Sequence, residues 1–456
     1  RRGRGKSRLH RIRPAGGRTM SVKLGIISLG CDKNRVDTEN LLAYAGDAGI
    51  EFTADENEAD VILINTCAFI KKSQQEAIDT ILEFVEKKKE RDFKIIVTGC
   101  LPERYKQEIV DAIPEVDAFL GISEYSKIAD VIKSVEEGKK VVDFTPCDLP
   151  STKRVLTTPY HYAYLKIAEG CDNHCTYCAI PKIRGKFRSR TIESLYDEAK
   201  ILVDEYGVKE LNIVAQDITR YGIDIYNEYA LLKLLDKITS LDVEWVRLLY
   251  CYPELLSDDL IKYIVKNDKI CKYVDIPLQH IDDTILKTMG RRTSEKEIKN
   301  LIEKIRNAGD VAIRSTFIVG FPGETDEQFQ KLYDFIGEYK LNYAGFFAYS
   351  KEDGTAAAKL KNQIPQAVKN KRLKNITALQ SKVIFENNKN YVGKSLKVLY
   401  EGIDYDNNIF YGRPEFCAPE VDAKVLFSSD NLVNVGNFYD VKITGTNGYD
   451  LVGEVK

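Results

Sequence analysis

Short apolar runs alternate with amphipathic stretches along the first third of the chain. Residues 23–29, 61–64 and 94–97 are apolar runs that indicate buried strands. Apolar residues with helical spacing follow these runs, for example over 36–48 and 73–88. Because strand–helix repetition implies right-handed crossovers between parallel strands, residues 22–150 are predicted to form a doubly wound parallel sheet domain of the α/β class.

A second block, residues 157–386, repeats the strand–helix alternation about six times. The candidate strands are 163–167, 210–214, 245–249, 273–276, 312–319 and 343–348. Six units are too few for a closed eight-fold barrel, so we expect a partial (β/α)6 barrel with its active site at the carboxyl ends of the strands. The proline-containing stretch 143–159 is predicted to be a linker, and residues 366–390 a long polar helix.

The third block, residues 391–456, changes character. Its short strands, 396–400, 409–412, 423–427 and 439–444, are separated by Gly, Asn and Asp, and Asn447-Gly448 indicates a hairpin before a last strand. About five short strands in so short a segment predict a small antiparallel β-barrel of the oligonucleotide-binding type.

Composition excludes several classes. With 44% hydrophobic and 30% charged residues among 456, the chain has the composition of a globular protein, not that of a disordered or fibrous one. No apolar run reaches the roughly 18 residues that a membrane span needs. Residues 1–19 carry eight Arg or Lys and no acid. They either form a basic arm for nucleic acid or precede a true start at Met20, and we favour a tail outside the fold.

The ten cysteines change the picture most. The chain is large, has no secretory signal and clusters three cysteines, which indicates metal or redox chemistry in a reducing, cytoplasmic compartment. Cys147, Cys251, Cys271 and Cys417 belong to no motif, and we interpret them as packing or surface residues.

Cys171, Cys175 and Cys178 lie within eight residues, directly after the first predicted barrel strand. Three thiolates at this spacing can bind three irons of a [4Fe–4S] cluster and leave the fourth iron open to a substrate or cofactor. Structural zinc is the alternative, but it lacks an obvious fourth ligand, because His174 lies inside the loop with its side chain expected to point away from the thiolates.

This Cys-x3-Cys-x2-Cys loop resembles that of the radical S-adenosylmethionine enzymes. The resemblance implies that the open iron chelates S-adenosylmethionine and that an electron from the cluster cleaves the sulfonium to a 5′-deoxyadenosyl radical. Tyr177 matches the aromatic position beside the adenine. Four further residues at predicted strand ends are either cofactor contacts or structural turns: Gln216, Asp217, Gly320 and Glu324. We predict no catalytic residue beyond the cluster ligands.

Cys31, Cys67 and Cys100 form a second group, although 36 and 33 residues separate them. Each follows a predicted strand, and the carboxyl ends of parallel strands share one edge, so the three cysteines are expected to converge on a second metal site. Taken singly, each could instead be a buried core thiol.

Together the two groups resemble the methylthiotransferases, a family with a three-cysteine N-terminal domain, a radical S-adenosylmethionine barrel and a C-terminal TRAM-like barrel for substrate recognition. Further matching segments are 180–190, 277–280, 286–292 and 317–324. The resemblance implies two [4Fe–4S] clusters and S-adenosylmethionine as both methyl donor and radical source. It also implies an external sulfide on the N-terminal cluster and an electron donor such as a flavodoxin or ferredoxin.

The charge of the third block bears on the substrate. Residues 391–456 hold six Lys or Arg and ten acids, a net charge of −4, whereas a module that holds tRNA should be basic. An acidic barrel suits a basic protein, and Gly30–Arg35, Pro277–His280 and the segment 412–422 resemble the branch that modifies an aspartate β-carbon in the twelfth small-subunit ribosomal protein. The alternatives are the branch that modifies a tRNA adenosine and, in another class, a non-catalytic zinc-bearing module that binds ribosomes or RNA.

Overall fold

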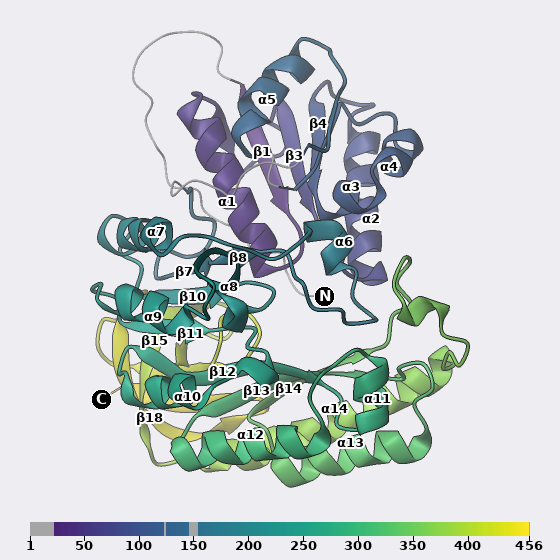
Figure 1. The fold of residues 1–456 in the computed structure, drawn as a ribbon. Helices are drawn as coiled ribbons and strands as arrows, with labels where there is room; N and C mark the ends of the chain where they lie inside the picture. The colour runs from purple at the N-terminus through teal and green to yellow at the C-terminus, as the bar shows by residue number, and fades with distance from the viewer. Residues whose placement is uncertain (1–21, 123–124, 146–153, 456) are drawn as a thin grey trace. The chain divides into compact units, whose positions relative to one another are not determined.

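The computed structural model describes residues 22–122, 125–145 and 154–455, which form two compact units (Figure 1). Unit 1 takes in the described parts of Arg1–Pro159, together with Tyr164–Asp172 and Cys178–Glu198; unit 2 takes in Tyr160–Ala163, Asn173–Tyr177 and the chain from Ala199. The predicted basic tail 1–19 and residues 146–153 of the predicted linker 143–159, which include Cys147, lie outside the described residues.

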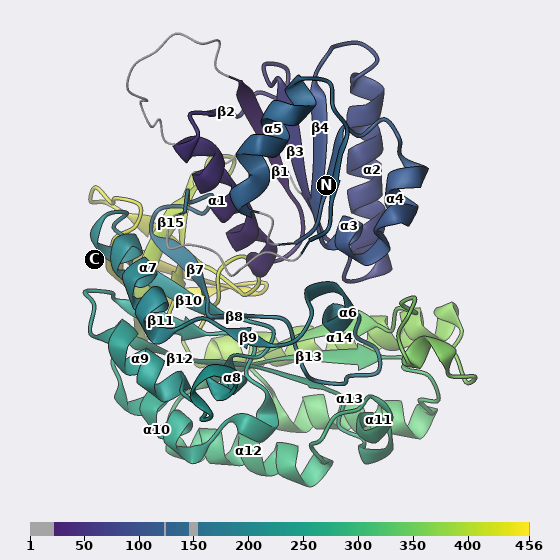
Figure 2. The ribbon, with the colours of Figure 1, turned by 45° about the horizontal axis from the view of Figure 1, so that its top comes forward.

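Unit 1 contains a six-stranded parallel sheet in the order β2-β1-β3-β4-β5-β6. Its strands are β1 (Lys23–Ser28), β2 (Glu51–Thr53), β3 (Val61–Thr66), β4 (Lys94–Gly99), β5 (Ala118–Leu120) and β6 (Val141–Asp143). Helices α1 (Asp32–Asp47) and α5 (Ile128–Glu136) cover one face, and α2 (Lys71–Lys87), α3 (Cys100–Tyr105) and α4 (Gln107–Ala112) cover the other (Figures 1 and 2). The doubly wound sheet is confirmed.

Alternate residues of the central strands fill the two cores of this sheet. Leu63 and Ile96 pack with α1 and α5, whereas Ile62, Ile64 and Val97 pack with α2, α3 and α4. Strands buried on both faces are nearly continuous apolar runs, which is why β1, β3 and β4 could be predicted. The sequence pattern did not predict β2, β5 and β6, because three residues are too few to show a period.

Unit 1 also includes part of the chain on either side of the loop that holds Cys171, Cys175 and Cys178. Residues Tyr164–Asp172 contain most of β7 (Tyr162–Lys166) and all of β8 (Ala168–Glu169). Cys178–Glu198 contains α6 (Ile180–Arg184), β9 (Arg188–Ser189) and the start of α7 (Ile192–Asp204), and β8 pairs antiparallel with β9.

Strands β14 to β10 of an open sheet lie in unit 2, and the order of the whole sheet is β14-β13-β12-β11-β10-β7, of which β7 gives only its first two residues to unit 2. Its remaining strands are β10 (Glu210–Val214), β11 (Trp245–Leu248), β12 (Ile270–Gln279), β13 (Ala312–Val319) and β14 (Tyr343–Ala348). The helices of this part are α8 (Ile223–Tyr226), α9 (Leu231–Thr239), α10 (Asp258–Lys266), α11 (Asp283–Thr288), α12 (Glu295–Ala308), α13 (Asp326–Tyr339) and α14 (Gln366–Lys389). The predicted partial barrel of six strands is confirmed.

The C-terminal block forms a closed barrel in the order β15-β16-β17-β19-β18. Its strands are β15 (Ser395–Asp404), β16 (Ile409–Pro414), β17 (Val425–Ser429), β18 (Phe438–Asn447) and β19 (Asp450–Val455). The closed barrel is confirmed, but the prediction of an antiparallel barrel is wrong for one pair, because β17 and β19 run parallel. Strand directions cannot alternate all the way around a ring with an odd number of strands, so one parallel pair is required.

Buried ion pairs join this barrel to the open sheet within unit 2. Glu210, the first residue of β10, accepts from Arg413 Nη2 at 2.6 Å and from Arg247 Nε at 2.7 Å. Burial raises the pKa of Glu210, but the two guanidinium groups outweigh burial and lower it to about 2. Tyr273 donates to Asp422 at 2.7 Å. Removal of the barrel would therefore leave buried charges without partners, which is strongly destabilising.

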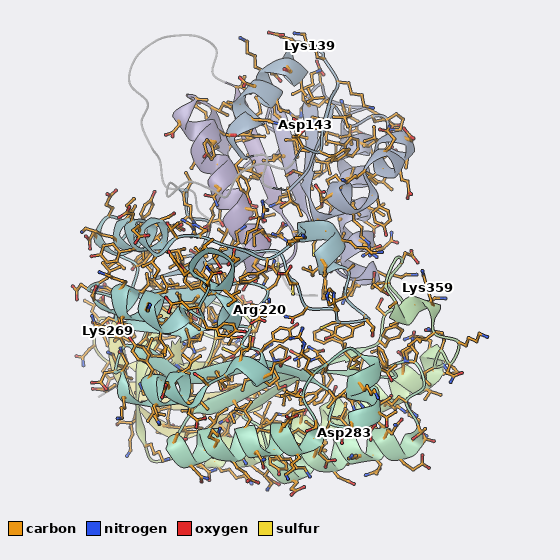
Figure 3. All side chains as sticks on the ribbon, viewed as in Figure 1. Lys139, Asp143, Arg220, Lys269, Asp283 and Lys359 are labelled. Carbon is orange, nitrogen blue, oxygen red and sulfur yellow. The ribbon has the colours of Figure 1, made fainter. Side chains whose placement is uncertain are left out.

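Side chains fill the interior of each unit (Figure 3). Among the described helices, none combines the length and apolar character needed to cross a membrane.

Candidate functional site

Cys31, Cys67 and Cys100, here called the strand-end triad, follow three neighbouring strands of unit 1. Cys31 precedes α1, Cys67 follows β3, and Cys100 begins α3 directly after β4. The parallel register pairs Ser28 with Asn65 and Thr66 with Gly99, so the three cysteines leave the same edge of the sheet at nearly the same level.

Two glycines allow the close approach of these strand ends. A Cβ added to Gly30 would lie 3.0 Å from Cys67 Sγ, and one added to Gly99 would lie 2.3 Å from Asn65 Oδ1. Both glycines have a positive φ, of 97° and 96°, which side chains with a Cβ rarely adopt. Glycine at these two positions therefore sets the spacing of the triad.

Polar groups at the start of α1 form hydrogen bonds with the residues at this edge of the sheet. Asn34 donates to the Leu29 carbonyl at 2.6 Å, and Asn65 donates to the Asn34 carbonyl at 2.9 Å and to Thr38 Oγ1 at 2.8 Å. The first turns of α1 are buried although they are polar, which apolar periodicity could not have predicted. Burial raises the pKa of Cys67, and it raises the pKa of Cys100 to about 12 against the opposing effect of Arg184.

Cys171, Cys175 and Cys178, here called the loop triad, lie in one loop that contributes to both units. In unit 1 the Cys171 amide donates to the Gly185 carbonyl at 3.1 Å, and the Ile180 amide donates to Cys178 Sγ at 3.4 Å. Gly170 precedes the first cysteine with a φ of 75°, and a Cβ there would lie 2.1 Å from the Lys186 carbonyl oxygen. The segment after α6 therefore holds the start of the loop.

In unit 2 the middle of the loop is held by residues that the sequence analysis assigned no role. Cys175 Sγ lies 3.6 Å from Tyr252 OH and 3.8 Å from Arg291 Nη1. The Arg291 guanidinium is buried, lies 4.3 Å from the centre of the Tyr252 ring and donates to the Pro277 carbonyl at 2.9 Å. Arg291 lies inside the family-like segment 286–292, which was the only sequence signal for it.

Asp217, a predicted cofactor contact, is buried directly after β10. Its Oδ2 accepts from Asn173 Nδ2 at 3.1 Å, and its Oδ1 accepts from Thr219, so it holds the cysteine loop. Burial raises the pKa of Asp217. Gln216 beside it is half-buried. Tyr177 packs against an apolar cluster that includes Met289 and Phe321.

Glu324 and Gly320 lie after β13 in a buried cluster of polar groups. Glu324 accepts from the Gly320 amide and from Arg372 Nη1, and its Oε1 lies 3.1 Å from His280 Nε2. These contacts are those of a structural turn, which was the alternative for both residues. A cofactor role for Tyr177, Gln216, Asp217, Gly320 and Glu324 stays a prediction.

The donor sets fit iron–sulfur ligation in their chemistry. N–H groups of Arg184, Ile180 and Arg291 point at Cys100, Cys178 and Cys175, and such donors stabilise thiolate ligands. Within residues 22–122, 125–145 and 154–455, no three His, Cys, Asp or Glu side chains are gathered closely enough to hold a metal ion. The six cysteine ligands therefore remain a prediction.

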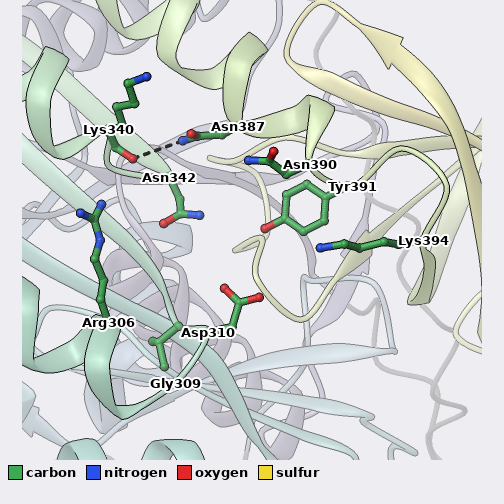
Figure 4. A pocket seen from close by; sticks show the side chains of 10 residues that line it. Arg306, Gly309, Asp310, Lys340, Asn342, Asn387, Asn390, Tyr391 and Lys394 are labelled. Atoms are coloured by element: carbon green, nitrogen blue, oxygen red, sulfur yellow. Dashed lines mark hydrogen bonds between the residues drawn. The ribbon is translucent and has the colours of Figure 1, made fainter.

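A polar cavity of about 490 Å³ lies elsewhere in unit 2 (Figure 4). It is lined by Val311 and Asn342, which precede β13 and β14, and by Arg306, Lys340 and Tyr391 among others. This is the amino-terminal edge of the sheet, away from the strand ends that carry the candidate site. Of the cysteines outside the triads, Cys251, Cys271 and Cys417 are buried and unbridged, as predicted for packing residues.

A partial barrel with three closely spaced cysteines after its first strand defines the radical S-adenosylmethionine class of enzymes. The Radical SAM superfamily model matches residues 165–336, the Uncharacterized protein family UPF0004 model matches 23–121, and the TRAM domain model matches 392–455. The methyltransferase TsrM from Kitasatospora setae has the same fold, with a TM-score of 0.56 at 12% identity over 80% of this chain and 89% of that one. The cobalamin-dependent radical enzyme OxsB also matches, with a TM-score of 0.51 at 13% identity over 80% of this chain and 56% of that one.

Comparison with curated relatives places the chain in one family within this class of enzymes. The ribosomal protein uS12 methylthiotransferase RimO of Thermoanaerobacter sp. (strain X514) is 45% identical over 94% of this chain and 99% of its own. That of Alkaliphilus oremlandii is 47% identical over 95% and 99%. The chain therefore belongs to the RimO family of methylthiotransferases. The predicted family, fold class and enzyme class are confirmed, and S-adenosylmethionine and [4Fe–4S] clusters are the cofactors that membership implies.

Proposed function

We propose that this chain adds a methylthio group to the β-carbon of an aspartate in ribosomal protein uS12. The observation that carries the proposal is the identity of 45–47% over nearly the whole chain with proteins of that activity. The presence of both cysteine triads at the carboxyl ends of parallel strands supports it, because this is where α/β sheets and barrels place their chemistry.

In this proposal each cysteine triad binds one of two clusters with different roles. Cys171, Cys175 and Cys178 would hold the radical cluster, and Cys31, Cys67 and Cys100 the second, sulfur-handling cluster with its external sulfide. When bound, S-adenosylmethionine supplies the methyl group and the radical that removes the substrate hydrogen. Asp217 and Arg291 hold the loop triad in place through Asn173 and Cys175.

The closed barrel provides a surface for a basic protein partner. Asp404 pairs with Ile409, and Phe410 pairs with Phe427, so the turn 405–408 and the loop after β17 emerge at the same end of the barrel. Tyr405 and Leu432 are 86% and 96% exposed there. They are flanked by the exposed acids Asp406 and Asp430. Apolar tips between acids suit a lysine-rich segment of a ribosomal protein and would repel a phosphate backbone.

An electron must reach the radical cluster from outside the chain. We propose that a small redox protein such as a flavodoxin or ferredoxin delivers it. The nine described cysteines are free thiols, which supports a reducing compartment, and we place the activity in the cytoplasm.

Anaerobic reconstitution followed by mass spectrometry tests the proposal. We expect about eight irons per chain, matched by sulfide, and a uS12 peptide that gains one methylthio group in place of one hydrogen. Parallel reactions with tRNA should give no modified adenosine. Modified tRNA with unmodified uS12 would contradict the proposal that uS12 is the substrate. Two zinc ions per chain without sulfide would contradict the proposed methylthiotransferase activity.

Charge reversal on the barrel tests its role without removing it. The double variant Asp406→Lys with Asp430→Lys should weaken uS12 binding in a salt-dependent way and leave cleavage of S-adenosylmethionine unchanged. Glu303→Lys, an exposed acid on α12, is the matched control and should leave binding unchanged. Equal binding by the double variant and the control would contradict a docking role for this end of the barrel.

A further inference from the structure

Four buried charges of alternating sign form a closed ring in unit 1. They are Asp37 on α1, Lys166 on β7, Glu169 on β8 and Arg184 at the end of α6. Arg184 lies 3.0 Å from both Asp37 and Glu169, and Lys166 lies 2.7 Å from Glu169 and also contacts Asp37. Each side chain is at most 5% exposed, so the ring is shielded from water.

The ring is electrically neutral only as a whole. Each cation contacts both acids, and each acid contacts both cations, so every charge in the ring is paired twice. Replacing one member by a neutral residue would therefore leave a net buried charge that surrounding water screens only weakly.

Arg184 is the member of the ring that touches the strand-end triad. Its Nη2 lies 3.5 Å from Cys100 Sγ and 3.4 Å from Asn34 Oδ1, on the side away from Glu169. The next residue, Gly185, accepts the Cys171 amide, so the end of α6 contacts segments that bear cysteines of both triads. A hydrogen bond to the Cys100 sulfur can be made by a neutral donor, so the positive charge of Arg184 is an additional feature of this contact.

We propose that Arg184, backed by this ring, is a positioning residue that sets the reduction potential of the cluster bound by Cys31, Cys67 and Cys100. The inference rests on the proposed function, which places a cluster there. One-electron reduction makes a cluster more negative, and a fixed cation beside a thiolate ligand stabilises the reduced form, so the potential rises. The acids of the ring act in the opposite direction through their own charge.

Redox titration of the strand-end cluster by itself tests the proposal. The parent protein is the full chain with Cys175→Ala, which removes the radical cluster and leaves one reducible centre. Electron paramagnetic resonance then reports its midpoint potential against a chemical reductant. Arg184→Gln should disfavour reduction by about tenfold, or 59 mV for one electron. Arg184→Lys should show a smaller shift than Arg184→Gln, because lysine keeps the positive charge but lacks the planar guanidinium group.

The sign of the shift separates an electrostatic role from a structural one. Glu169→Gln should raise the midpoint potential, whereas Lys166→Gln, which touches no cysteine, should lower it. Both shifts remain measurable even if Arg184→Gln fails to retain its cluster. Arg154→Gln is the matched control, because Arg154 is equally buried in unit 1 and its ion pairs run to Glu39 and Glu198, which are not members of the ring.

The results of these titrations distinguish failure of this inference from failure of the proposed function. An unchanged midpoint in Arg184→Gln with a normal cluster would overturn this inference and leave the proposed function standing. Shifts of the same sign in Glu169→Gln and Lys166→Gln, or a shift in Arg154→Gln as large as in Arg184→Gln, would also overturn it. A Cys175→Ala parent without any reducible cluster would overturn the proposed second cluster, and this inference with it.

Discussion

The strand-end triad and the loop triad place three thiols by different means. Cys31, Cys67 and Cys100 are separated by 36 and 33 residues and depend on the register of β1, β3 and β4. The cysteines of the loop triad lie within eight residues, so the local chain alone limits their spacing. The strand-end triad can therefore exist only when the sheet has formed, and its cluster binding should be coupled to folding.

The two triads are alike in one respect. Each has a buried arginine near one thiol, Arg184 at 3.5 Å from Cys100 and Arg291 at 3.8 Å from Cys175. Arg184 belongs to a ring with two acids, whereas the described contacts of Arg291 are a carbonyl, an aromatic ring and a thiol. A sheet edge and a loop can therefore each place a buried guanidinium group beside one thiol of a triad.

The largest effect should come from Cys175→Ala. It removes one ligand of the loop triad, so we expect loss of about half the iron and of all reductive cleavage of S-adenosylmethionine, with the sheet of unit 1 still folded. Iron analysis and detection of 5′-deoxyadenosine measure both. Cleavage at the parental rate would contradict the assignment of residues 171–178.

Cys67→Ala changes the other triad and should separate the two half-reactions. The loop triad is unaltered, so 5′-deoxyadenosine should still form, but methylthiolated product should be absent because sulfur has no cluster to bind. Product and 5′-deoxyadenosine are quantified in one reaction. A normal yield of product would reduce the strand-end triad to core packing.

Gly99→Ala tests whether backbone geometry alone sets the strand-end triad. At a φ of 96° the new Cβ would lie 2.3 Å from Asn65 Oδ1, so we expect a loss of about 1–3 kcal/mol in the free energy of unfolding and loss of the second cluster. Denaturant unfolding and iron content measure these effects. Gly138→Ala, with a φ of 77° and no atom within 4 Å of the Cβ, is the control for strain and should keep both clusters.

Arg291→Gln should have the smallest effect of the four. Loss of a residue that orients a ligand costs about 10–100-fold in cluster affinity or activity, so S-adenosylmethionine cleavage should fall by that factor while the strand-end cluster is retained. Its neighbour Arg292 is exposed, and Arg292→Gln is the matched control. Similar rates for the two variants would remove Arg291 from the site.

Much of the fold could be read from periodicity. β13 and β14 coincide with the predicted strands, and α14 ends one residue from the predicted bound, because long apolar runs and helical spacing record burial directly. The edge strands β2 and β6 were missed because their three residues show no period. The parallel pair β17–β19 was missed because strand direction within a closed ring is a property of the whole barrel.

By itself, the sequence determined the alternation of strands and helices, the spacing of the loop triad and membership of the methylthiotransferases, since these depend on neighbours along the chain. Tertiary structure alone decided which buried charged side chains pair with one another. Asp37 is 147 residues from Arg184 and 129 from Lys166, and no local pattern relates them. Burial makes such partners mandatory, because a lone charge in the interior is costly, but only packing selects which partners they are.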